Sequence, residues 1–594
     1  MIDSERLRNA YDRAREQLLA ERTADGHWIG QLSTSALSTA TAVSALSVVR
    51  EHGGADARFD DAIEGGVRWL TAHQNDDGGF GDTDKSYSNI ATTMLVSAAF
   101  HLAGKADQNV ALLKRADAYI QSKGAVAGLR QRYGKDKTFA VPILTNCALA
   151  GLASWKDVSA LPFELACVPQ RFYRFARMPV VSYAIPALVA IGQARYFHRK
   201  PLLPWMRLIR WAAKRPSLRA LRRMQPESGG YLEATPLTSF VVMSLASAGG
   251  VDHPVTQEGV RFLLDSMLDD GSWPIDTNLA TWTTTLAMGA LAGVGEDVVT
   301  LGCLDWLLSC QHRRVHPFTG ADPGGWGWTD LSGAVPDADD TPGALLALAV
   351  WRNSPSCSER DRARINEAAT AGIEWLLNIQ NSNGGWPTFC RGWGKLPFDR
   401  SGADLTAHAL RALKAWWDLP FGKRLEHAAD AGFLFLAQRQ REDGSWNPLW
   451  FGNQDHPDEE NPIYGTAKVL LAYRDWQRAG TEQAKAALAW LCTSQNDDGG
   501  WGGGTAVVDA SEGRRQSSVE ETALTVETLA SMPLSEDQRM HLERGGAWLV
   551  EAVESDAFLD AAPIGFYFAK LWYYEKLYPL IFTVSALGKV KMLY

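Results

Sequence analysis

A spacing of aromatic residues around a glutamine recurs along this chain and limits how it can fold. In the first copy Trp69 lies five residues before Gln74, and Phe80 lies six residues after it. A helical apolar pattern precedes each copy. Between the glutamine and the second ring of the copy, a Gly pair or Gly-Ser supplies the positive φ that ends a helix and turns the chain. Three further copies keep both distances: Trp375, Gln380 and Trp386; Phe435, Gln440 and Trp446; Trp490, Gln495 and Trp501. Four matches at one spacing indicate a structural repeat.

Incomplete copies of the same frame lie between the complete ones. They are Gln225 to Tyr231, which keeps the second half; Phe262, Met267 and Trp273, which lose the glutamine; and Trp306, Gln311 and Trp326, in which the loop is longer. The repeat predicts a helix, a tight turn closed by the Gln side chain and covered by the ring, and a second helix such as residues 405–417 or 521–531. Strand patterns are nearly absent, so we predict an all-α fold. Such helical hairpins either stack into an open solenoid or close into an α/α barrel, and the spacing does not choose between them.

Length and cysteine content restrict the remaining possibilities. A chain of 594 residues exceeds the size at which one hydrophobic core keeps growing, which favours two domains. The seven Cys are scattered and include no Cys-x-x-Cys pair, so we expect neither a disulfide framework nor a zinc knuckle, and a reducing compartment. The first residues lack a basic segment followed by an apolar one, so we also expect no secretory signal.

Positive charge is concentrated in one part of a chain whose net charge is −9. The net charge argues against a nucleic-acid partner. Residues 158–226, however, carry thirteen Lys and Arg against the single acid Glu164, which gives a local charge of +12. Inside this part, residues 178–192 are apolar but too short and too interrupted by proline to span a bilayer.

Cations and aromatic rings flank this apolar run, as they do in proteins that lie in one leaflet of a membrane. We therefore predict that a segment of about residues 158–224 binds membrane lipid, and that the protein is peripheral or monotopic on the cytoplasmic face of the cell membrane. The alternative is a buried helix with a basic, solvated face.

A dense acidic cluster is the first indication of chemistry. Asp337, Asp339 and Asp340 occupy three of four consecutive positions. Taken out of water, such a cluster cannot keep all its carboxylates ionised, so one member is a candidate Brønsted acid. A solvated acidic turn or a metal site is the alternative for such a cluster in isolation. His408, on an apolar helical pattern, is a second candidate, although a lone His there is more often structural.

Three features together are similar to a known family: the Gln-to-Trp frame, the cluster Asp337-Ala338-Asp339-Asp340-Thr341, and Asp404-Leu405-Thr406-Ala407-His408. The chain resembles squalene-hopene cyclases, the class II terpene cyclases of bacteria, from about residue 26 to the aromatic region near residue 568. The resemblance implies two α/α barrels that enclose a central apolar cavity, no cofactor or metal, and entry of a hydrocarbon from one membrane leaflet. We place the first barrel at residues 16–275 and the second at 276–594, with about the first fifteen residues packed on the second.

The resemblance assigns Asp339 as the proton donor, with Asp337 and Asp340 as its neighbours and His408 as its hydrogen-bond partner. Protonating an alkene requires an acid that is neutral and yet releases its proton readily. Burial and neighbouring negative charge raise the pKa and meet the first condition, and a protonated His408 would meet the second by stabilising the carboxylate left behind. Asp404, four residues before His408 on one helical face, is expected to orient the imidazole or its water.

A carbocation formed in this way needs negative potential without a reactive nucleophile, and aromatic faces provide it. By resemblance, the rings that line the cavity are Trp282, Trp328, Phe389 and Trp450. The terminal aromatic wall corresponds to Phe566, Tyr567, Phe568, Trp572, Tyr573, Tyr574 and Tyr578. Of these we expect Phe566, Tyr567 and Tyr574 to contact the substrate, with a register uncertain by one residue. Core packing is the alternative for each ring.

The resemblance implies proton-initiated polycyclisation of a linear isoprenoid, squalene to hopene or hopanol in the first instance. Three departures leave the substrate open: the chain is short for a triterpene cyclase, Pro342 and Gly343 follow the acid cluster, and no arginine can be placed beside His408. A C35 polyprene, a diterpenyl diphosphate and a prenylated aromatic remain alternatives. So do two other classes, a zinc-dependent prenyltransferase-like barrel and a helical scaffold without activity. A homodimer is also left open.

Overall fold

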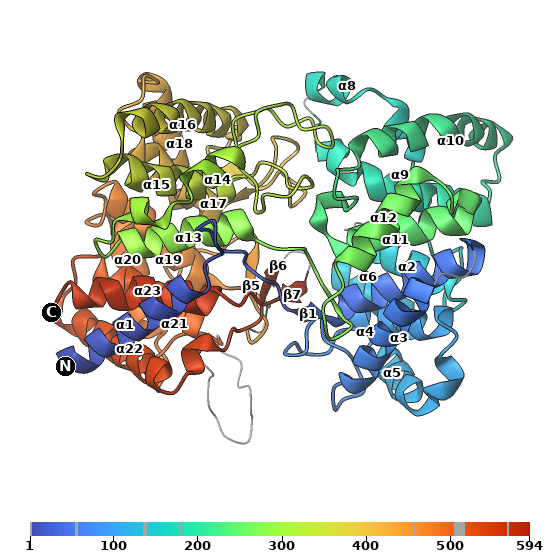
Figure 1. Cartoon of the computed structure of the whole chain (residues 1–594), viewed down its shortest axis with the longest axis horizontal. Coiled ribbons are helices and arrows are strands. Elements are labelled where there is room, and N and C mark those ends of the chain that lie inside the picture. The colour runs from blue at the N-terminus through green and yellow to red at the C-terminus, as the bar shows by residue number, and fades with distance from the viewer. Residues whose placement is uncertain are drawn as a thin grey trace.

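Two helical barrels lie side by side in the structure (Figure 1). The computed structural model describes residues 3–53, 57–134, 139–176, 178, 180–456, 458–503, 517–566 and 570–594, without the side chains of residues 57, 180 and 566. Within these ranges long helices alternate with turns, and the strands are two or three residues long. The prediction of an all-α fold is confirmed.

The C-terminal barrel is a closed ring of inner helices. Each inner helix contacts the next along the chain, and α23 returns to contact α13, so the hairpins close into a barrel and not into an open solenoid. Outer helices cover this ring, and α1 (Ser4–Ala20) packs against α22 and α23. The inner helices are α13 (Ala280–Ala292), α15 (Asp340–Asn353), α17 (Ala403–Ala415), α19 (Pro462–Asp475), α21 (Val519–Ala530) and α23 (Tyr578–Lys591). The outer ones are α14 (Leu304–Ser309), α16 (Glu359–Ile379), α18 (Lys423–Arg439), α20 (Glu482–Thr493) and α22 (Glu536–Glu554).

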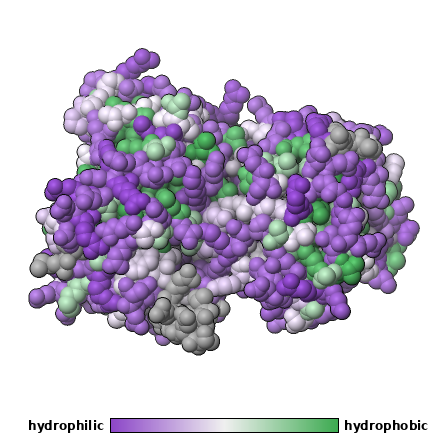
Figure 2. Space-filling view, turned by 60° about the horizontal axis from the view of Figure 1, so that its bottom comes forward, coloured by the Kyte–Doolittle hydropathy of each residue, from purple (hydrophilic) through white to green (hydrophobic). Residues whose placement is uncertain are grey.

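The N-terminal barrel closes in the same way, because α11 contacts both α9 and α2. Its inner helices are α2 (Ala36–Gly53), α4 (Ile90–Leu102), α7 (Ala140–Leu149), α9 (Val180–His198) and α11 (Thr235–Leu245). Outside them lie α3 (Ala57–Ala72), α5 (Val110–Ser122), α6 (Ala125–Tyr133), α10 (Pro204–Met224) and α12 (Pro254–Asp265), and the short α8 (Gln170–Phe175) precedes α9. One face of the molecule, seen in Figure 2, is mostly hydrophilic with apolar residues in scattered patches.

The repeated turns have the geometry that the sequence predicts. At Gln380 the side-chain amide donates to the carbonyl of Gly384 (2.8 Å), which closes the turn, and to that of Ala428 (2.9 Å), which ties the turn to the next outer helix. Gly384 has a φ of +87°, a left-handed value that favours glycine. The indole of Trp386 covers the turn and donates to the carbonyl of Leu376 (2.9 Å). The copies at Gln440 and Gln495 repeat all these contacts.

Each repeat also fixes the inner helix that follows it. The backbone N–H of Trp386 donates to the hydroxyl of Thr406 (3.0 Å) on α17, and β3 (Trp386–Pro387) pairs with β4 (Ser401–Gly402) just before that helix. Thr406 lies between Asp404 and His408 in the sequence, so the turn holds the helix that carries both candidates.

Short antiparallel strands join loops around the barrels. In one sheet β5 (Phe451–Asn453), β6 (Ile564–Phe566) and β7 (Leu571–Tyr573) lie in that order, and in another β1 (Thr34–Ser35) pairs with β2 (Trp273–Pro274). The backbone N–H of Trp572 in β7 donates to the buried carboxylate of Asp82 (2.9 Å), which connects the C-terminal strands to a turn of the N-terminal barrel.

From residue 180 onward the apolar run lies in α9, an inner helix of the N-terminal barrel. Tyr183, Ile185 and Val189 of this helix are buried, and the helix packs against α11. This part of the run has the burial that the alternative, a buried helix, predicts. Exposed apolar side chains instead lie before and after it, at Phe172, Phe175, Phe197, Leu202, Leu203, Trp205, Leu208, Ile209 and Trp211. None of the helices within the described ranges is long and apolar enough to cross a bilayer.

Candidate active site

The acid cluster lies where the chain enters α15, an inner helix of the C-terminal barrel. The backbone N–H groups of Asp339 and Asp340 both donate to Oδ1 of Asp337, at 2.8 and 2.7 Å. An aspartate in this position satisfies the free N–H groups at the start of a helix. The N–H of Asp337 in turn donates to the carbonyl of Trp326 (3.0 Å), so the repeat turn holds the cluster in place.

His408 on α17 faces Asp339. Its Nδ1 lies 3.4 Å from Oδ1 of Asp339, and 11% of the His408 side chain and 18% of the Asp339 side chain are exposed. Gly343, one of the departures noted in the sequence, lies beside the ring: a Cβ there would stand 3.7 Å from Cε1 of His408. The structure thus brings together the two residues that the sequence assigns to proton transfer.

Asp404 has a different environment from the one expected. Its Oδ1 accepts the backbone N–H of Leu449 (3.0 Å), and its Oδ2 is buried without a hydrogen-bond partner among the described residues. No direct hydrogen bond joins Asp404 to His408 among the described residues, and the expectation that it orients the imidazole or its water stays a prediction.

Burial sets the protonation state of these acids. Removal from water raises the pKa of Asp337, of Asp339 and of Asp404 to about 7, and that of Asp340 well above its usual range. The charge of Asp337 raises the pKa of Asp340 further. The four carboxyl groups titrate as an interacting set, so the first to ionise makes it harder for the others. Neutral carboxylic acid is therefore available in this cluster at neutral pH.

The surroundings of His408 disfavour the protonated imidazole that we expected. Burial lowers its pKa well below the usual range, and the positive charges of Lys468 and Arg411 lower it further. The role of an imidazolium in stabilising the Asp339 carboxylate stays a prediction. The sequence alone did not show the influence of these two cations.

Arg411 and Lys468 come from two adjacent inner helices. Arg411 lies three residues after His408 on α17, and its Nε forms an ion pair with Oδ2 of Asp475 (2.8 Å). Lys468 lies on α19, four residues after Tyr464. Residues three or four apart share a helix face, so this spacing would have placed each cation beside a residue of the inner surface.

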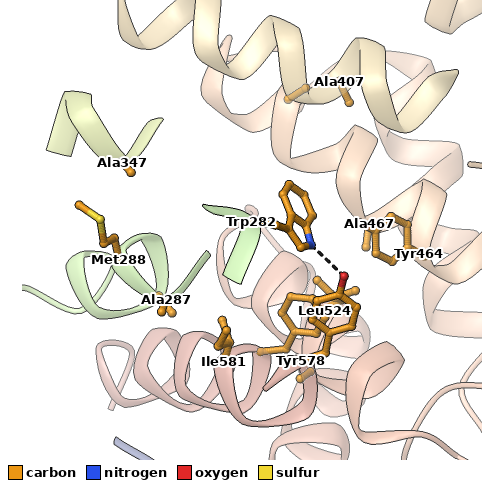
Figure 3. Close-up of a cluster of buried hydrophobic side chains, with 14 of the residues drawn as sticks. Trp282, Ala287, Met288, Ala347, Ala407, Tyr464, Ala467, Leu524, Tyr578 and Ile581 are labelled. Carbon is orange, nitrogen blue, oxygen red and sulfur yellow. Dashed lines mark hydrogen bonds between the residues drawn. The ribbon is translucent and has the colours of Figure 1, made fainter. Parts of the chain in front are cut away.

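Aromatic rings continue from His408 along the interior. Trp282 meets His408 edge to face, with 5.8 Å between ring centroids, and its indole donates to the hydroxyl of Tyr578 (2.9 Å; Figure 3). Phe389 lies edge to face with both Trp328 (6.2 Å) and Trp450 (6.0 Å). The structure thus joins three of the four rings that the resemblance assigns to the cavity, and sets the fourth against the histidine.

The expected C-terminal contacts need a change of register. Tyr574 lies apart from the rings above: its hydroxyl donates to Asp84 (2.9 Å), and Lys85 lies over its ring. The hydroxyl of Tyr573 instead lies 3.3 Å from that of Tyr578. Side chains alternate between the two faces of a strand, so a shift of one residue in β7 exchanges inside for outside. Phe566 pairs through its backbone with Phe451, but its side chain and the whole of Tyr567 lie outside the described residues.

A second pair of buried carboxyl groups was not predicted. The indole of Trp328 donates to Oδ1 of Asp276 (3.4 Å), and Glu233 accepts from Ser228 and from the backbone N–H of Gly333. Burial raises the pKa of both acids, and the charge of Glu233 raises that of Asp276 further. These residues follow incomplete repeats in the sequence, where nothing marks them as functional.

A possible metal-binding group lies in a loop between β5 and α19. His456, Asp458 and Glu460 have ligand atoms within 4.8 Å of one another. One oxygen of Glu460 is bound by Arg441 (2.7 Å). The group contains no cysteine, which the zinc-dependent alternative would need.

Comparison with known families and proteins shows which family the chain matches. The family of squalene-hopene cyclase C-terminal domains matches residues 279–592, and that of the N-terminal domains matches residues 11–201. The squalene-hopene cyclase of Bradyrhizobium diazoefficiens is 24% identical over 84% of this chain and 81% of its own length. Enfumafungin synthase of Hormonema carpetanum is 25% identical over 95% of this chain, but the chain spans only 47% of that longer protein.

A solved structure shares the whole architecture. The ent-copalyl diphosphate synthase from Streptomyces platensis superposes with a TM-score of 0.61, covers 99% of both chains and is 17% identical in sequence. At this identity the likeness concerns the fold, which is that of two α/α barrels.

Proposed function

The chain belongs to the squalene-hopene cyclase family of class II terpene cyclases, and from this we propose that Asp339 starts a cyclisation by protonating a linear isoprenoid. The observation that carries the proposal is the contact of Asp339 with His408, 3.4 Å apart, at the start of an inner helix. Asp339 is desolvated and yet keeps 18% of its side-chain surface exposed. We infer that it faces an enclosed apolar space and not bulk water.

Cyclisation begins when Asp339 protonates the terminal alkene of the substrate. The O–H bond of the neutral acid breaks, the proton bonds to one alkene carbon, and the electron pair of the alkene forms the new C–H bond. The carboxylate remains on the protein, and the other alkene carbon becomes a cation that the next double bond attacks. The last cation either loses a proton or captures water.

Trp282, Trp328, Phe389 and Trp450 are proposed to face these cations. Their π faces offer negative potential without forming a bond to the cationic carbon. Each cation–π contact stabilises a desolvated cation by on the order of 1–2 kcal/mol. Phe389 contacts Trp328 and Trp450, and Trp282 contacts His408, so each ring is held in place before the substrate binds and loses little further freedom when it does.

Squalene is the first substrate to test. The relative from Bradyrhizobium diazoefficiens bears the name squalene-hopene cyclase, whereas other similar proteins are named for different products. The length of the isoprenoid substrate is therefore what the first experiment determines. Purified protein is to be incubated with squalene, a C35 polyprene, geranylgeranyl diphosphate and a prenylated aromatic, and the extracted lipids analysed by gas chromatography and mass spectrometry. A polycyclic product from any of them supports the proposal. Recovery of every substrate unchanged contradicts it.

We also propose that the exposed apolar residues of α8 and α10 bind one leaflet on the cytoplasmic face of the cell membrane. Phe172 and Phe175 lie on α8, while Leu208 and Trp211 lie on α10, three residues apart on one face. The local charge of +12 in residues 158–226 favours anionic headgroups. A hydrocarbon substrate dissolves in the bilayer, which gives such attachment a purpose.

Replacing both Leu208 and Trp211 by glutamate is expected to weaken binding to anionic vesicles by at least about tenfold, since burying one large apolar side chain is worth about 1.5–3 kcal/mol. Sedimentation with vesicles of mixed phosphatidylglycerol and phosphatidylcholine measures this. Leu434→Glu on α18 of the other barrel is the matched control, because Leu434 is 60% exposed, close to the 65% of Leu208. Equal binding by the double variant and the control would contradict the membrane proposal.

The rate of cyclisation is expected to fall as pH rises through about 7. Burial raises the pKa of Asp339 to about 7, and only its neutral form can donate a proton, so activity is full below that pH and lost above it. A profile of kcat against pH checks this, with circular dichroism at each pH to show that the protein stays folded. Activity that rises between pH 6 and pH 8 would exclude Asp339 as the acid.

A further inference from the structure

Asp276, in the loop between β2 and α13, contacts one of the rings that are proposed to face the cations. Its Oδ1 accepts the indole N–H of Trp328 (3.4 Å) and the backbone N–H of Thr277 (2.8 Å). Its Oδ2 has no hydrogen-bond partner among the described residues. The side chain is removed from bulk water and yet is not completely covered. Oδ2 is therefore free to bond a molecule that lies against Trp328.

A series of contacts joins Asp276 to the proposed proton donor. The carbonyl of Trp328, whose indole bonds Asp276, accepts the backbone N–H of Trp282 (3.2 Å). Trp282 meets His408 edge to face (5.8 Å), and Nδ1 of His408 lies 3.4 Å from Oδ1 of Asp339. A substrate bound along these rings can therefore meet both Asp276 and Asp339.

Glu233 supports Asp276 from the neighbouring backbone segment. Ala234, the next residue, forms an antiparallel bridge with Asp276. Oε1 of Glu233 accepts from the hydroxyl of Ser228 (2.7 Å) and from the backbone N–H of Gly333 (2.6 Å), and these two donors stabilise its carboxylate. Its Oε2 is buried without a partner among the described residues. A fixed negative charge thus lies close to the Asp276 carboxyl group.

These surroundings make Asp276 a hydrogen-bond donor. Burial, and next the charge of Glu233, raise the pKa of Asp276 well above its usual range, so the acid is neutral at neutral pH. Because Oδ1 accepts two N–H groups, the proton lies on Oδ2. No hydrogen bond joins the two carboxyl groups in the described part of the chain. The O–H group of Asp276 thus needs an acceptor that a bound molecule supplies.

We propose that Asp276 determines substrate specificity: its Oδ2–H donates a hydrogen bond to a neutral oxygen atom of the isoprenoid, in a hydroxyl or a carbonyl group. The inference rests on the proposed function and names the class of its substrate. A pure hydrocarbon such as squalene would leave this donor unpaired in a site without water. A site built to bond an oxygen discriminates strongly against the analogue that lacks it.

The same geometry disfavours a diphosphate at this place. The charge that acts on Asp276 is the negative one of Glu233, and no positive charge of a described residue acts on it. A diphosphate would bring further negative charge into this desolvated region without a cation to compensate it. A neutral oxygen group meets the same donor without that cost.

The experiment uses pairs of substrates that differ in one oxygen atom. Farnesol and geranylgeraniol are each compared with the hydrocarbon in which a methyl group replaces CH₂OH, and kcat/KM is measured by gas chromatography and mass spectrometry. Asp276→Leu removes the donor at similar volume, whereas Asp276→Asn keeps a donor in its amide. Asp269→Leu is the control, because Asp269 is exposed and precedes Asp276 by only seven residues.

The unaltered protein is expected to prefer the alcohol to its matched hydrocarbon by at least about tenfold in kcat/KM, since a buried donor left unpaired costs at least this much. In Asp276→Leu the ratio should fall to about one. Asp276→Asn and Asp269→Leu should keep most of the preference. A role of Asp276 in packing alone predicts lower thermal stability with an unchanged ratio. Equal kcat/KM for alcohol and hydrocarbon in the unaltered protein would overturn the inference.

A second measurement needs no turnover. The infrared band of the neutral carboxyl group, assigned to Asp276 by its loss in Asp276→Asn, is followed while each alcohol or hydrocarbon is added to Asp339→Asn. The band is expected to move to lower wavenumber with the alcohol and to stay in place with the hydrocarbon. An unmoved band at saturating alcohol contradicts the inference. This measurement also decides the case if Asp276→Leu does not fold, and Asp276→Ala is a second apolar variant.

The two measurements separate the inference from the proposed function. A displaced band in a protein that cyclises none of the substrates would refute the proposed function and leave the oxygen-binding role of Asp276 established. Cyclisation of squalene with no displaced band and no preference for alcohols would refute the role of Asp276 and leave the proposed function intact.

Discussion

Replacement of Asp339 by asparagine should reduce cyclisation by about 10²–10⁴-fold, because general acids contribute rate factors of this size and an amide cannot donate a proton to an alkene. Asparagine has nearly the same shape and, like the resting acid, is neutral, so the free energy of unfolding should change little. Product formation from squalene and the other substrates, followed by gas chromatography and mass spectrometry, gives the measurement.

Asp305→Asn is the control for this variant. Asp305 lies at the surface on α14, where it pairs with Arg364 (2.6 Å), and its replacement should leave product formation unchanged. Thermal unfolding followed by circular dichroism shows whether each variant is folded. Full turnover by folded Asp339→Asn would refute the assignment of the proton donor.

The second large effect concerns stability. Trp446→Ala is expected to lower the free energy of unfolding of the C-terminal barrel by about 3–5 kcal/mol, the usual cost of emptying a buried tryptophan site. The Trp446 side chain is 0% exposed, and its indole donates to the carbonyl of Leu436 (2.8 Å), which would lose one of its two donors and keep the backbone N–H of Gln440 (3.0 Å). Urea unfolding followed by circular dichroism measures the change.

Trp393→Ala provides the comparison, because Trp393 is 54% exposed and, among the described residues, its one hydrogen bond is from its backbone N–H to Asp399. It should cost no more than about 1 kcal/mol. An equal loss of stability in both variants would contradict the stabilising role of the repeat tryptophans at their turns.

Local spacing was enough to predict the repeated turns and to single out the acid cluster. Gln380 and Trp386 make the contacts expected of them because these contacts depend on residues within one turn and on the backbone of the adjoining helix. The pairing of Asp339 with His408 came from a family resemblance, since 69 residues separate the two along the chain. Closure into barrels was not predictable from spacing, because it depends on contacts between α23 and α13 at opposite ends of the repeat series.

Where the sequence was insufficient, the cause was the packing of other elements. The pKa of His408 is lowered first by burial and then by the charges of Lys468, on the next inner helix, and of Arg411. Whether Tyr573 or Tyr574 faces Tyr578 depends on how β7 pairs with β6. The run at residues 178–192 has the same composition whether it meets lipid or the inside of a barrel, and only its packing against α11 decides.

The order of the helices along the chain has a consequence for biosynthesis. The N-terminal barrel is built from one continuous stretch, from α2 to α12, so it can fold while the rest is still being made. Helix α1 leaves the ribosome before that barrel, yet its apolar residues Leu7, Tyr11 and Leu18 pack in the C-terminal barrel, where α23 is translated after the other inner helices. At a synthesis rate of about 5–20 residues per second, α1 waits roughly half a minute or longer for α23. Throughout this time its apolar face must be shielded from neighbouring nascent chains.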